Sequence, residues 1–550
     1  MIQKDRIYET MKRLVAVPTV SGTREEAQGA RALQELLYEI PYFAEHKETV
    51  KLVPLRNDPL HRSIVTAFLD LHPNNPNTVI LSGHYDVVDV EEFGPLQDIA
   101  YDVEAVTKRI GEMPIDEDTR KDWASGEWLF GRGTADMKYG HALCLELLRY
   151  YSENPDAIDG KLLYVAVCGE ETNSEGMLRA VDFFNDFAEE NHLHYVAFLL
   201  TECYMMEDQA GDTNRYIHYG SSGKVMPMFF FVGESSHAGE PFLGIDPTMM
   251  SVEVYRRLQL NTDFCQESHG ATTPPPACLK LQDLKTTYSV SMPLYAVAYY
   301  TYITVALDPA AMMAKLRMIA EEAMQEAIRT YEKRVEEYVA VTGEKTPART
   351  YAPCVMTYRE LLEAIQKDYA GNLTKDLAAY ADKLRESKPE IQDVAVALVK
   401  HTVELYKNKG PMIVYGLIPP YYPDSYLPKE DPDTAGLMEA CDRVIAYADR
   451  TYGEKLRMKD WYMGISDMCY TGLAEGRRFD ALFENLIGIG SIYPFPEASL
   501  RKFKVPGIVL GGYGKDFHKN TERLHKHYNF DVLPDLYVKL IDDLLKKKQK

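Results

Sequence analysis

Histidine and acidic residues follow several apolar, strand-like runs of this chain in a pattern that suits metal binding. The polar clusters contain His84, Asp86, Asp136, Glu170, Glu171, Glu202 and His518. Imidazole and carboxylate ligands without thiolate are typical of zinc, with manganese and cobalt as competitors. Because ligands bind at the carboxyl ends of strands in open α/β sheets, we expect these distant clusters to meet at one edge of a sheet.

The first two clusters could supply a ligand, its support and a bridge. His84 and Asp86 are two residues apart in an extended segment and therefore point the same way. The Asp86 carboxylate can orient the His84 imidazole from behind the metal, although an exposed strand-end turn is the simpler explanation of this pair taken alone. Asp136 is the only acid in the glycine-rich loop 131–138, where its carboxylate could bridge two cations.

The remaining clusters complete two ligand sets. Glu170 and Glu171 are adjacent carboxylates whose burial is costly unless a cation compensates, the alternative being exposure to solvent. Glu202 is a single acid after an apolar run, and His518, which taken alone would usually be structural, lies in segment 514–522. We predict one metal on His84, Asp136 and Glu202, and a second on Asp136, Glu171 and His518. Glu170 stays free beside them as a general base.

Apolar runs and helical periodicities predict the elements that hold these clusters. Buried strands are expected at 78–82, 162–167 and 196–200, and helices at 5–14, 25–40, 140–150 and 176–187. The middle of the chain combines strands at 224–232, 295–305 and 412–418 with helices at 246–258, 308–339, 358–369 and 391–406. From 434 onward, a helix to 452, a strand at 505–510 and a final helix restore the earlier pattern. The simplest architecture is an α/β domain built from both ends of the chain, with a second α+β domain inserted between them.

Composition restricts the class of protein. The 550 residues carry 61 Lys+Arg and 83 Asp+Glu, a net charge of −22, which argues against nucleic acid as a partner. No stretch offers the ~20 uncharged apolar residues that span a bilayer, and the N-terminus lacks a secretory apolar segment. The eight cysteines contain no CxxC pair, so we expect a cytoplasmic protein without a disulfide framework.

The order of these clusters resembles that of the dinuclear-zinc metallopeptidase family that includes aminoacylase, glutamate carboxypeptidase and succinyl-diaminopimelate desuccinylase. Segments 236–239 and 244–247 resemble the lid-domain histidine motif of that family, and 464–467 resembles its segment before the last catalytic strands. The resemblance covers most of the chain and strengthens the ligand assignment. Chain length, a long lid and the motif that begins at Gly131 most resemble RocB-type arginine-utilisation proteins within the family.

The resemblance implies a zinc-exopeptidase-like catalytic domain, a mixed sheet flanked by helices, at 1–220 and 426–550. The inserted region 221–425 would be an α+β, ferredoxin-like lid enlarged by extra helices. Two cations would lower the pKa of a shared water from about 15.7 towards ~7, and the resulting metal-bridging hydroxide would attack a carbonyl. Glu170 would take the proton and pass it to the leaving nitrogen, while His237 on the lid would stabilise the oxyanion.

We predict hydrolysis of a C–N amide, peptide or ureido bond in a small amino-acid-derived substrate. The resemblance suggests arginine-related amino acids as its source. A di- or aminopeptidase on the same scaffold is the alternative, and a non-catalytic metal-dependent binding protein is an alternative of another class. The chain is expected to be a homodimer or a monomer. The extra, highly charged helices of the lid slightly favour the monomer.

Three positions depart from the family pattern. Tyr139 follows the motif lysine, Lys138, where the family often has glycine. Thr521 and Glu522 stand where Asn-Glu usually follows the metal histidine. The region 292–304 carries neither the lid asparagine nor the arginine with which many members hold a substrate carboxylate. Capture of a substrate carboxylate as in the exopeptidases therefore lacks its usual residues here.

Overall fold

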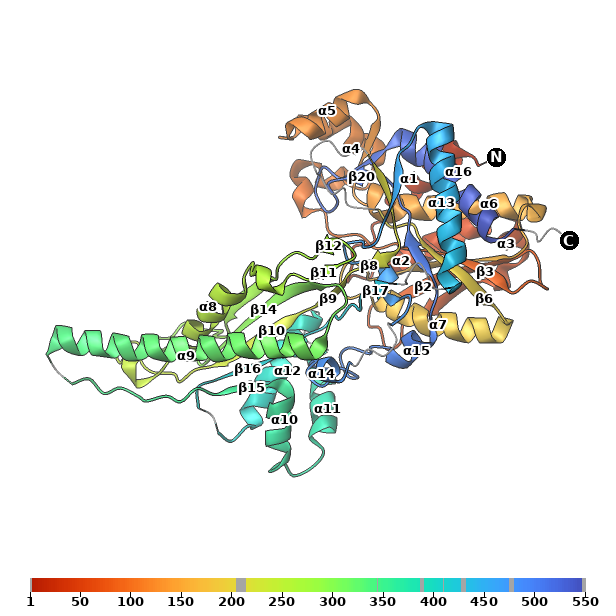
Figure 1. Cartoon of the computed structure of the whole chain (residues 1–550). Coiled ribbons are helices and arrows are strands. Elements are labelled where there is room, and N and C mark those ends of the chain that lie inside the picture. Colours follow the sequence, from red (N-terminus) through yellow and green to blue (C-terminus); the bar gives the residue numbers. More distant parts are fainter. Residues whose placement is uncertain are drawn as a thin grey trace. The chain divides into compact units, whose positions relative to one another are not determined.

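The computed structural model describes residues 2–203, 214–343, 345–385, 390–408, 410–426, 432–473 and 479–546. The chain divides into two compact units. The first contains Met1–Ser222, Ser425–Ala474 and Pro496–Lys550, and the second contains Gly223–Asp424 and Glu475–Phe495. Both ends of the chain therefore belong to the first unit, as the colours from red to blue in Figure 1 show.

The segment Glu475–Phe495 belongs to the second unit, whereas the sequence-based boundaries place it within 426–550 of the catalytic domain. Leu417 N donates to Asn485 O at 2.9 Å, and Ile487 N donates to Leu417 O at 2.9 Å. Ile487 and Ile492 also join the apolar core of the second unit. Pairing with a distant strand therefore decides where this segment lies, and local periodicity carries no information on such a pairing.

An eight-stranded mixed sheet forms the centre of the first unit, in the order β1-β2-β5-β3-β6-β19-β7-β18. The strands are β1 (Val50–Pro54), β2 (Ser63–Asp70), β3 (Asn77–His84), β5 (Lys161–Val167), β6 (His194–Leu200), β7 (Arg215–His218), β18 (Leu456–Lys459) and β19 (Gly507–Val509). β1, β2 and β5 pair antiparallel, whereas β5, β3, β6 and β19 run parallel. The mixed sheet confirms the predicted fold class.

The α-helices of the first unit lie on both faces of this sheet or beside it. They are α1 (Lys4–Val15), α2 (Glu26–Tyr38), α3 (Pro41–Glu45), α4 (Val103–Arg109), α5 (Glu117–Ser125), α6 (Tyr139–Glu153), α7 (Glu175–Asn191), α13 (Pro432–Tyr452), α15 (Glu497–Lys502) and α16 (Leu533–Leu544). Tyr164 on β5 donates its hydroxyl to His141 of α6, whereas Phe68 on β2 lies edge-on against Phe187 of α7. Phe68 pairs with Leu163, the neighbour of Tyr164, so α6 and α7 lie on opposite faces.

A separate three-stranded sheet joins two distant parts of the first unit, in the order β20-β21-β4. Its strands are β4 (Trp128–Phe130), β20 (Gly514–Lys515) and β21 (Arg523–His525). Strands this short show no alternation of apolar and polar residues, and the sequence did not predict them. The small sheet places the loop after Phe130 beside the loop between β20 and β21.

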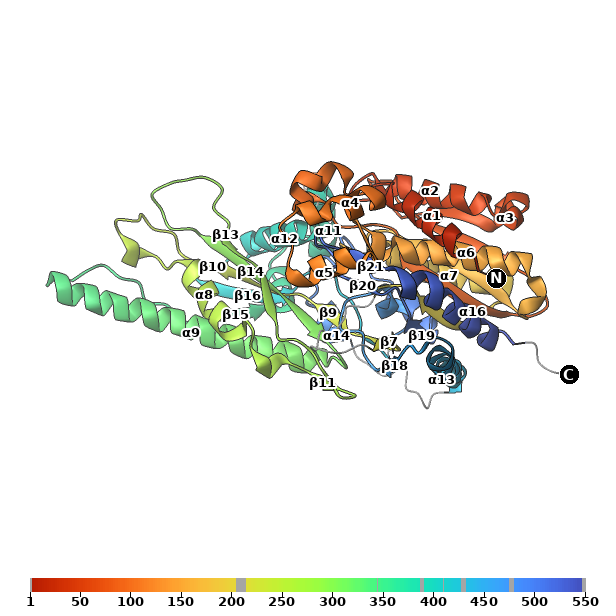
Figure 2. The same cartoon turned by 90° about the horizontal axis from the view of Figure 1, so that it is seen from above.

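The second unit is built on a sheet with the order β13-β14-β10-β16-β15, with β9 beside β14. Its strands are β9 (Gly223–Val225), β10 (Pro227–Val232), β13 (Ala277–Asp283), β14 (Tyr295–Thr304), β15 (Val355–Thr357) and β16 (Met412–Leu417). Its helices are α8 (Pro247–Leu258), α9 (Pro309–Thr342), α10 (Tyr358–Gln366), α11 (Leu373–Arg385), α12 (Ile391–Leu405) and α14 (Asp480–Phe483). Figures 1 and 2 show α9 as the long helix of this unit.

Alternate residues of β10 face two different helical layers. Phe230 and Val232 join the core formed with α10, α11 and α12. Phe229 stacks with Tyr415, whose hydroxyl donates to Met313 O of α9 at 3.3 Å. Helices therefore pack on both faces of this sheet, and the extra layer confirms the predicted enlargement by helices. The sequence predicted α10 and α12 but did not identify α11.

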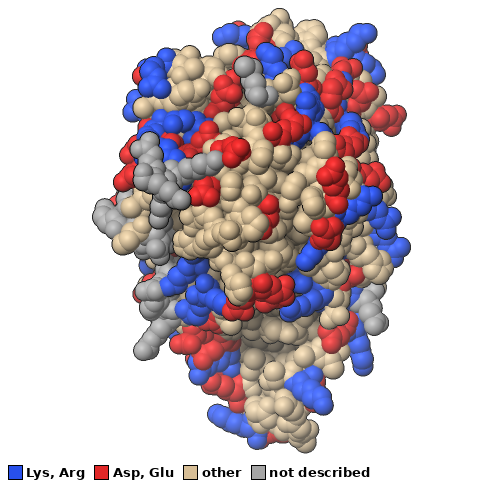
Figure 3. Space-filling model, turned by 90° about the vertical axis from the view of Figure 1, so that its right-hand side faces the viewer, with Lys and Arg blue, Asp and Glu red and all other residues tan. Residues whose placement is uncertain are grey.

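Among the helices that the structure describes, none has both the length and the apolar character that crossing a bilayer demands. Figure 3 shows acidic and basic side chains interspersed over one face of the molecule.

Candidate metal centre

The carboxyl ends of three neighbouring parallel strands place predicted ligands together in the first unit. His84 is the last residue of β3, Glu171 follows β5 and Glu202 follows β6. His84 pairs with Val167, the last residue of β5, so these strands end at the same level of the sheet. The local pattern of an apolar strand followed by an acid or imidazole therefore converges at one edge, as parallel strands require.

His84, Asp136 and Glu202 form one half of the candidate centre. His84 Nε2 lies 3.1 Å from Asp136 Oδ1 and 3.3 Å from Glu202 Oε2. All three side chains are buried. Cys203 places a buried thiol beside Asp136 and Glu202, and its Sγ donates to Glu202 Oε1 at 3.4 Å.

His518, Glu171 and again Asp136 form the other half. His518 Nε2 lies 3.0 Å from Glu171 Oε2 and 3.2 Å from Asp136 Oδ2. The two oxygens of Asp136 therefore face two different imidazoles, which is the arrangement expected of a bridging carboxylate. The structure thus brings together all five residues that the sequence predicts as ligands, and their roles stay predictions.

Asp86 contacts both His84 and the turn that carries the two glutamates. The Nδ1–H of His84 donates to the backbone carbonyl of Asp86 at 3.1 Å, whereas Asp86 Oδ1 is 3.6 Å from the same nitrogen. The Asp86 carboxylate also accepts from Ser21 Oγ at 2.6 Å and from the backbone N–H groups of Glu170 and Glu171 at 3.2 and 3.1 Å. It therefore fixes the turn that carries the two glutamates, while the backbone carbonyl sets the tautomer of His84.

A second buried histidine supports His84 from the α6 side. His141 lies with Nε2 2.7 Å from His84 O, and its Nδ1 accepts from Tyr164 Oη at 2.7 Å. Burial lowers the pKa of His141 to about 3, so the ring is neutral and its Nε2–H donates to the carbonyl. No sequence pattern indicated this residue, because a single histidine on a helix face has no recognisable spacing.

Arg132 and Glu522 join the Asp136 loop to the His518 loop. Arg132 Nη1 donates to Glu522 Oε2 at 2.7 Å, and Arg132 Nη2 donates to His518 O at 3.0 Å. Glu522 Oε1 accepts from the backbone N–H groups of Ala135 and Asp136 at 3.1 and 3.2 Å. Arg132 and Glu522 are both buried, so this ion pair holds together two candidate ligands that are far apart in the sequence.

Glu170 has no ligand position in either half. Burial, together with the carboxylates of Asp467, Glu171 and Glu202, raises the pKa of Glu170 well above its usual value. A carboxyl group with a raised pKa holds a proton more readily near neutral pH, which suits an acid–base role.

Asp467 is a buried acid. In the sequence it was indicated only because segment 464–467 resembles the family segment before the last catalytic strands. Neither of its carboxylate oxygens has a hydrogen-bond partner within the described part of the chain. Burial raises the pKa of Asp467 to about 8, with Glu202 and Asp86 acting in the same direction and His84 opposing them. It therefore adds a further acid to the surroundings of the candidate centre.

The residues present suit divalent cations. Glu202 Oε2 is buried and accepts no hydrogen bond from any residue that the structure describes. Hydrogen bonds to Asp136 and Glu171 raise the pKa of His518 to about 11, so the cluster strongly stabilises positive charge. One ligand atom each from His84, Asp136 and Glu171 lies within 4.8 Å of the others. Imidazole and carboxylate donors at these separations fit zinc, manganese or cobalt.

His237 lies in the second unit, on the loop between β10 and α8. It is exposed, and its Nδ1 accepts from Gly239 N at 3.0 Å. A neutral ring that accepts at Nδ1 carries its proton on Nε2, so Nε2–H is available as a donor. The loop therefore presents His237 as a hydrogen-bond donor, whereas its role in catalysis stays a prediction.

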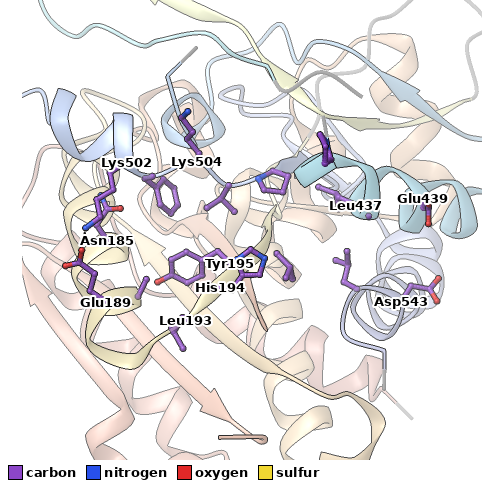
Figure 4. A pocket seen from close by; sticks show the side chains of 18 of the residues that line it. Asn185, Glu189, Leu193, His194, Tyr195, Leu437, Glu439, Lys502, Lys504 and Asp543 are labelled. Atoms are coloured by element: carbon purple, nitrogen blue, oxygen red, sulfur yellow. Dashed lines mark hydrogen bonds and ion pairs between the residues drawn. The ribbon is translucent and has the colours of Figure 1, made fainter. Parts of the chain in front are cut away.

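A surface pocket of about 620 Å³ lies elsewhere in the first unit (Figure 4). His194 and Tyr195, at the start of β6, line it together with Lys502 and Asp543. Glu202 follows the opposite end of β6. The pocket and the candidate metal centre therefore lie at opposite ends of strand β6.

Known proteins match this chain over most of its length. The model of peptidase family M20/M25/M40 matches residues 80–492. Protein RocB of Bacillus subtilis is 32% identical over 536 residues, which cover 96% of this chain and 93% of that protein. Protein YqjN of Bacillus subtilis, itself uncharacterized, is 32% identical over 548 residues, which cover 99% and 97%.

Solved structures show a similar fold. The di-peptidase Dug1p from Saccharomyces cerevisiae has a TM-score of 0.54 at 11% sequence identity, covering 99% of this chain and 97% of that one. At this identity the likeness concerns the fold.

Proposed function

Because the chain belongs to peptidase family M20/M25/M40, we propose that it uses two divalent metal ions to hydrolyse a C–N bond of a small amino-acid-derived substrate. The chain is a metal-dependent hydrolase of that family. What we propose is its class of substrate and the role of each residue in the centre. The bond would be an amide, peptide or ureido bond. The observation that carries the proposal is Asp136, whose two oxygens lie 3.1 Å from His84 Nε2 and 3.2 Å from His518 Nε2.

The proposed ligands form two sets that share one carboxylate. His84, Asp136 and Glu202 would hold one ion, and Asp136, Glu171 and His518 the other, with zinc the metal that this donor set suits best. Bound there, the ions would polarise the scissile carbonyl and lower the pKa of a shared water towards ~7. The remaining chemistry falls to Glu170, Asp86 and His237.

Glu170 is the proposed general base and acid. Its backbone N–H donates to Asp86 Oδ1 at 3.2 Å, so the residue is held at a fixed point of the turn after β5. Its raised pKa lets the carboxyl group keep the proton that it takes from water until the leaving nitrogen accepts it. Asp86 serves as a positioning residue, because its carboxylate fixes this turn and also lies 3.6 Å from His84 Nδ1.

His237 is the proposed oxyanion donor. Because Nδ1 accepts from Gly239 N, Nε2–H can donate to an oxygen that becomes negative in the transition state. Closure of the second unit over the substrate would bring the donor to the reaction, a motion of the kind that often limits turnover.

The likeness to protein RocB supports arginine-related amino acids as the source of the substrate, and we propose a place in arginine catabolism. The acidic surroundings of the centre, with Asp467 as a further buried carboxyl group, are compatible with a cationic substrate. The cysteine spacing further supports a reducing, cytoplasmic setting for the enzyme.

A substrate screen tests the proposed function. Protein loaded with two zinc, manganese or cobalt ions per chain is incubated with N-acetyl-arginine, other N-acyl amino acids, citrulline and arginine-containing dipeptides, and released amine or ammonia is measured. We expect turnover of one class that chelation abolishes and metal restores. No release from any class by fully loaded protein would contradict the proposal, and preference for dipeptides would favour the peptidase alternative.

The assembly of the enzyme is either a monomer or a homodimer. Mixing inactive His237→Ala protein with inactive Glu170→Gln protein distinguishes the two. Recovered activity would mean that His237 acts on the neighbouring subunit, whereas a monomer in which it acts within one chain stays inactive.

A further inference from the structure

Helix α9 is much longer than the sheet on which it packs. Its 34 residues extend about 51 Å, whereas the ten residues of β14 extend about 33 Å. Tyr331 is the last buried residue of the helix, and the eleven residues that follow it make no buried contact with the sheet. Figures 1 and 2 both show one end of α9 projecting beyond the strands of the second unit. Core packing therefore does not explain the far part of this helix.

The far part of α9 instead contacts the loop that carries His237. Tyr331 Oη donates to Phe242 O at 2.5 Å, and the rings of Phe242 and Tyr338 lie 5.2 Å apart. Tyr331 and Tyr338 are seven residues apart, two turns along one face of the helix. Phe242 lies five residues after His237 in the same loop. The helix thus holds the second half of the His237 loop.

The chain that returns after α9 holds the first half of the same loop. Arg349 N donates to Tyr331 Oη at 2.9 Å, and the Tyr351 ring lies 5.2 Å from the Tyr331 ring. Tyr351 Oη donates to Glu234 Oε2 at 3.0 Å, and Arg349 Nη2 lies 3.5 Å from Glu234 Oε1. Tyr331 therefore both donates to the loop and accepts from the returning segment, which joins the two supports.

The loop is also closed at its base and along its other side. Glu234 and Ile245 exchange two backbone hydrogen bonds of 3.0 Å. Ala238 N donates to Val290 O at 3.1 Å, and Met292 N donates to the carbonyl of Ser236 at 3.0 Å. His237 itself is exposed and makes few contacts of its own. Its position therefore depends on how firmly the surrounding loop is held.

We propose that the far part of α9 and residues 345–353 form a brace that positions His237 for the reaction, with Tyr331 and Tyr351 as positioning residues. This inference rests on the oxyanion role proposed for His237. The brace keeps Gly239 N in place against His237 Nδ1, and thereby keeps the donor proton on Nε2. The long helix then has a function in catalysis although it contributes no group to the reacting atoms.

Conservative tyrosine variants test the brace. Tyr331→Phe removes the hydroxyl that bonds Phe242 and Arg349 but keeps the ring, and Tyr351→Phe removes the bond to Glu234. Tyr288→Phe is the matched control, because Tyr288 is 93% exposed. Hydrogen exchange of residues 234–245 and the ¹⁵N shifts of the His237 ring are measured on metal-loaded protein without substrate.

We expect exchange in 234–245 to become about tenfold faster in Tyr331→Phe, as the loss of one or two hydrogen bonds predicts. The His237 ring should change from one tautomer to a mixture, while Tyr288→Phe leaves both readouts unchanged. Tyr351→Phe should give the same changes to a smaller degree. It tests the brace on its own if Tyr331→Phe fails to fold. Unchanged exchange and an unchanged tautomer in both variants would overturn the brace.

Kinetics separate the brace from the role of His237. On the substrate found in the screen, Tyr331→Phe should lower kcat about tenfold with little change in KM, and should have no further effect in a His237→Ala background. An equal fall of kcat in both backgrounds would overturn the brace, because Tyr331 would then act elsewhere. Full turnover of His237→Ala alone would contradict the oxyanion role, and the substrate-free measurements would still decide whether the brace holds the loop.

Discussion

Asp136 joins the two halves of the candidate metal centre, because each of its carboxylate oxygens faces a different histidine. Its backbone N–H donates to Glu522, so the loop that carries it is fixed from the far end of the chain. Glu171 and Glu202 each face one histidine only. At the scale of single residues, two roles are therefore divided within the centre. The candidate ligands could hold ions, whereas Glu170 could move a proton.

Replacing Glu170 with glutamine tests this separation. We expect Glu170→Gln to abolish turnover while two metal ions per chain are retained, because an amide cannot serve as a base and Glu170 has no ligand position. Metal content is measured by elemental analysis beside the activity assay. Glu190→Gln, an exposed position on α7, is the control. Loss of one ion in Glu170→Gln would mean that the roles of Glu170 and Glu171 are exchanged.

The donor role of His237 predicts a different kinetic effect. We expect His237→Ala to lower kcat by ~10²–10³-fold, the effect of losing one oxyanion donor. Metal occupancy should be unchanged, because the residue lies outside the first unit. Steady-state kinetics of metal-loaded protein measure the effect. Turnover close to that of the unaltered protein would remove His237 from the mechanism.

At the scale of elements, the small sheet of β4, β21 and β20 carries the connection between the two loops of the centre. The Arg132–Glu522 ion pair reinforces that sheet, and both side chains are buried. Removing one charge leaves the other buried and unpaired, which costs about 3–5 kcal/mol. The sheet and the ion pair together therefore determine how close Asp136 and His518 lie.

Glu522→Gln tests the importance of this junction. We expect it to weaken metal binding by ~10–100-fold, the usual effect of disturbing groups that orient ligands. It should also lower thermal stability, because Arg132 loses its partner. Chelator competition measures the affinity, and Glu35→Gln on the exposed side of α2 is the control. An unchanged metal affinity would show that the small sheet alone sets the ligand positions.

Strand β7 contributes a pH-dependent stability that is independent of the metal ligands. Burial, helped by Lys459, lowers the pKa of His218 to about 3, whereas an unfolded histidine has a pKa of about 6.5. The unfolded state therefore binds the proton first as the pH falls below ~6.5. Stability contributed by the neutral ring is present above that pH and is lost progressively as the pH falls towards 3.

His218→Phe tests this assignment, since the neighbouring rings of Tyr216 and Tyr462 can accommodate phenylalanine. Between pH 7.5 and 5, we expect the variant to lose about 2 kcal/mol less stability than the unaltered protein, because it has no proton to bind. Thermal unfolding at the two pH values measures the difference. Equal losses in both proteins would contradict the low pKa of His218.

At the scale of the whole molecule, the candidate ligands come from both ends of the chain but from only one of its two compact units. The proposed ions therefore connect residue 84 to residue 518 within the first unit, whereas the second unit contributes no ligand of the predicted set. Bound ions should stabilise the first unit by about 2.7 kcal/mol per site at a hundredfold excess over Kd.

Removing the metal tests this division. We expect chelation to lower the thermal transition of the first unit and to raise hydrogen exchange at the turns after β3, β5 and β6 and between β20 and β21. Exchange in β10, β14 and β16 of the second unit should stay the same. Added metal should reverse the changes. A similar increase of exchange in both units would mean that the ions stabilise the whole chain.

The sequence alone determined the parts of this protein that depend on local patterns. Apolar runs identified β3, β5 and β6, and the acid or imidazole directly after each run identified His84, Glu171 and Glu202 as candidate ligands. The sequence could do this because a buried strand and the polar residue at its end lie within about ten residues of each other. The mixed sheet and the enlarged second unit were instead implied by the resemblance to the metallopeptidase family, and helical periodicity located the helices at 308–339, 358–369 and 391–406.

Only the tertiary structure decided the features that depend on pairing between distant segments. The strands of the small sheet have two or three residues each, too few to show an alternation of apolar and polar residues. The Arg132–Glu522 junction therefore could not be predicted from the sequence. The place of Glu475–Phe495 and the contact of Tyr331 with the His237 loop likewise follow from packing over long separations. The physical reason is that a residue's type indicates what it can bind, whereas the fold alone determines which distant partner comes within reach.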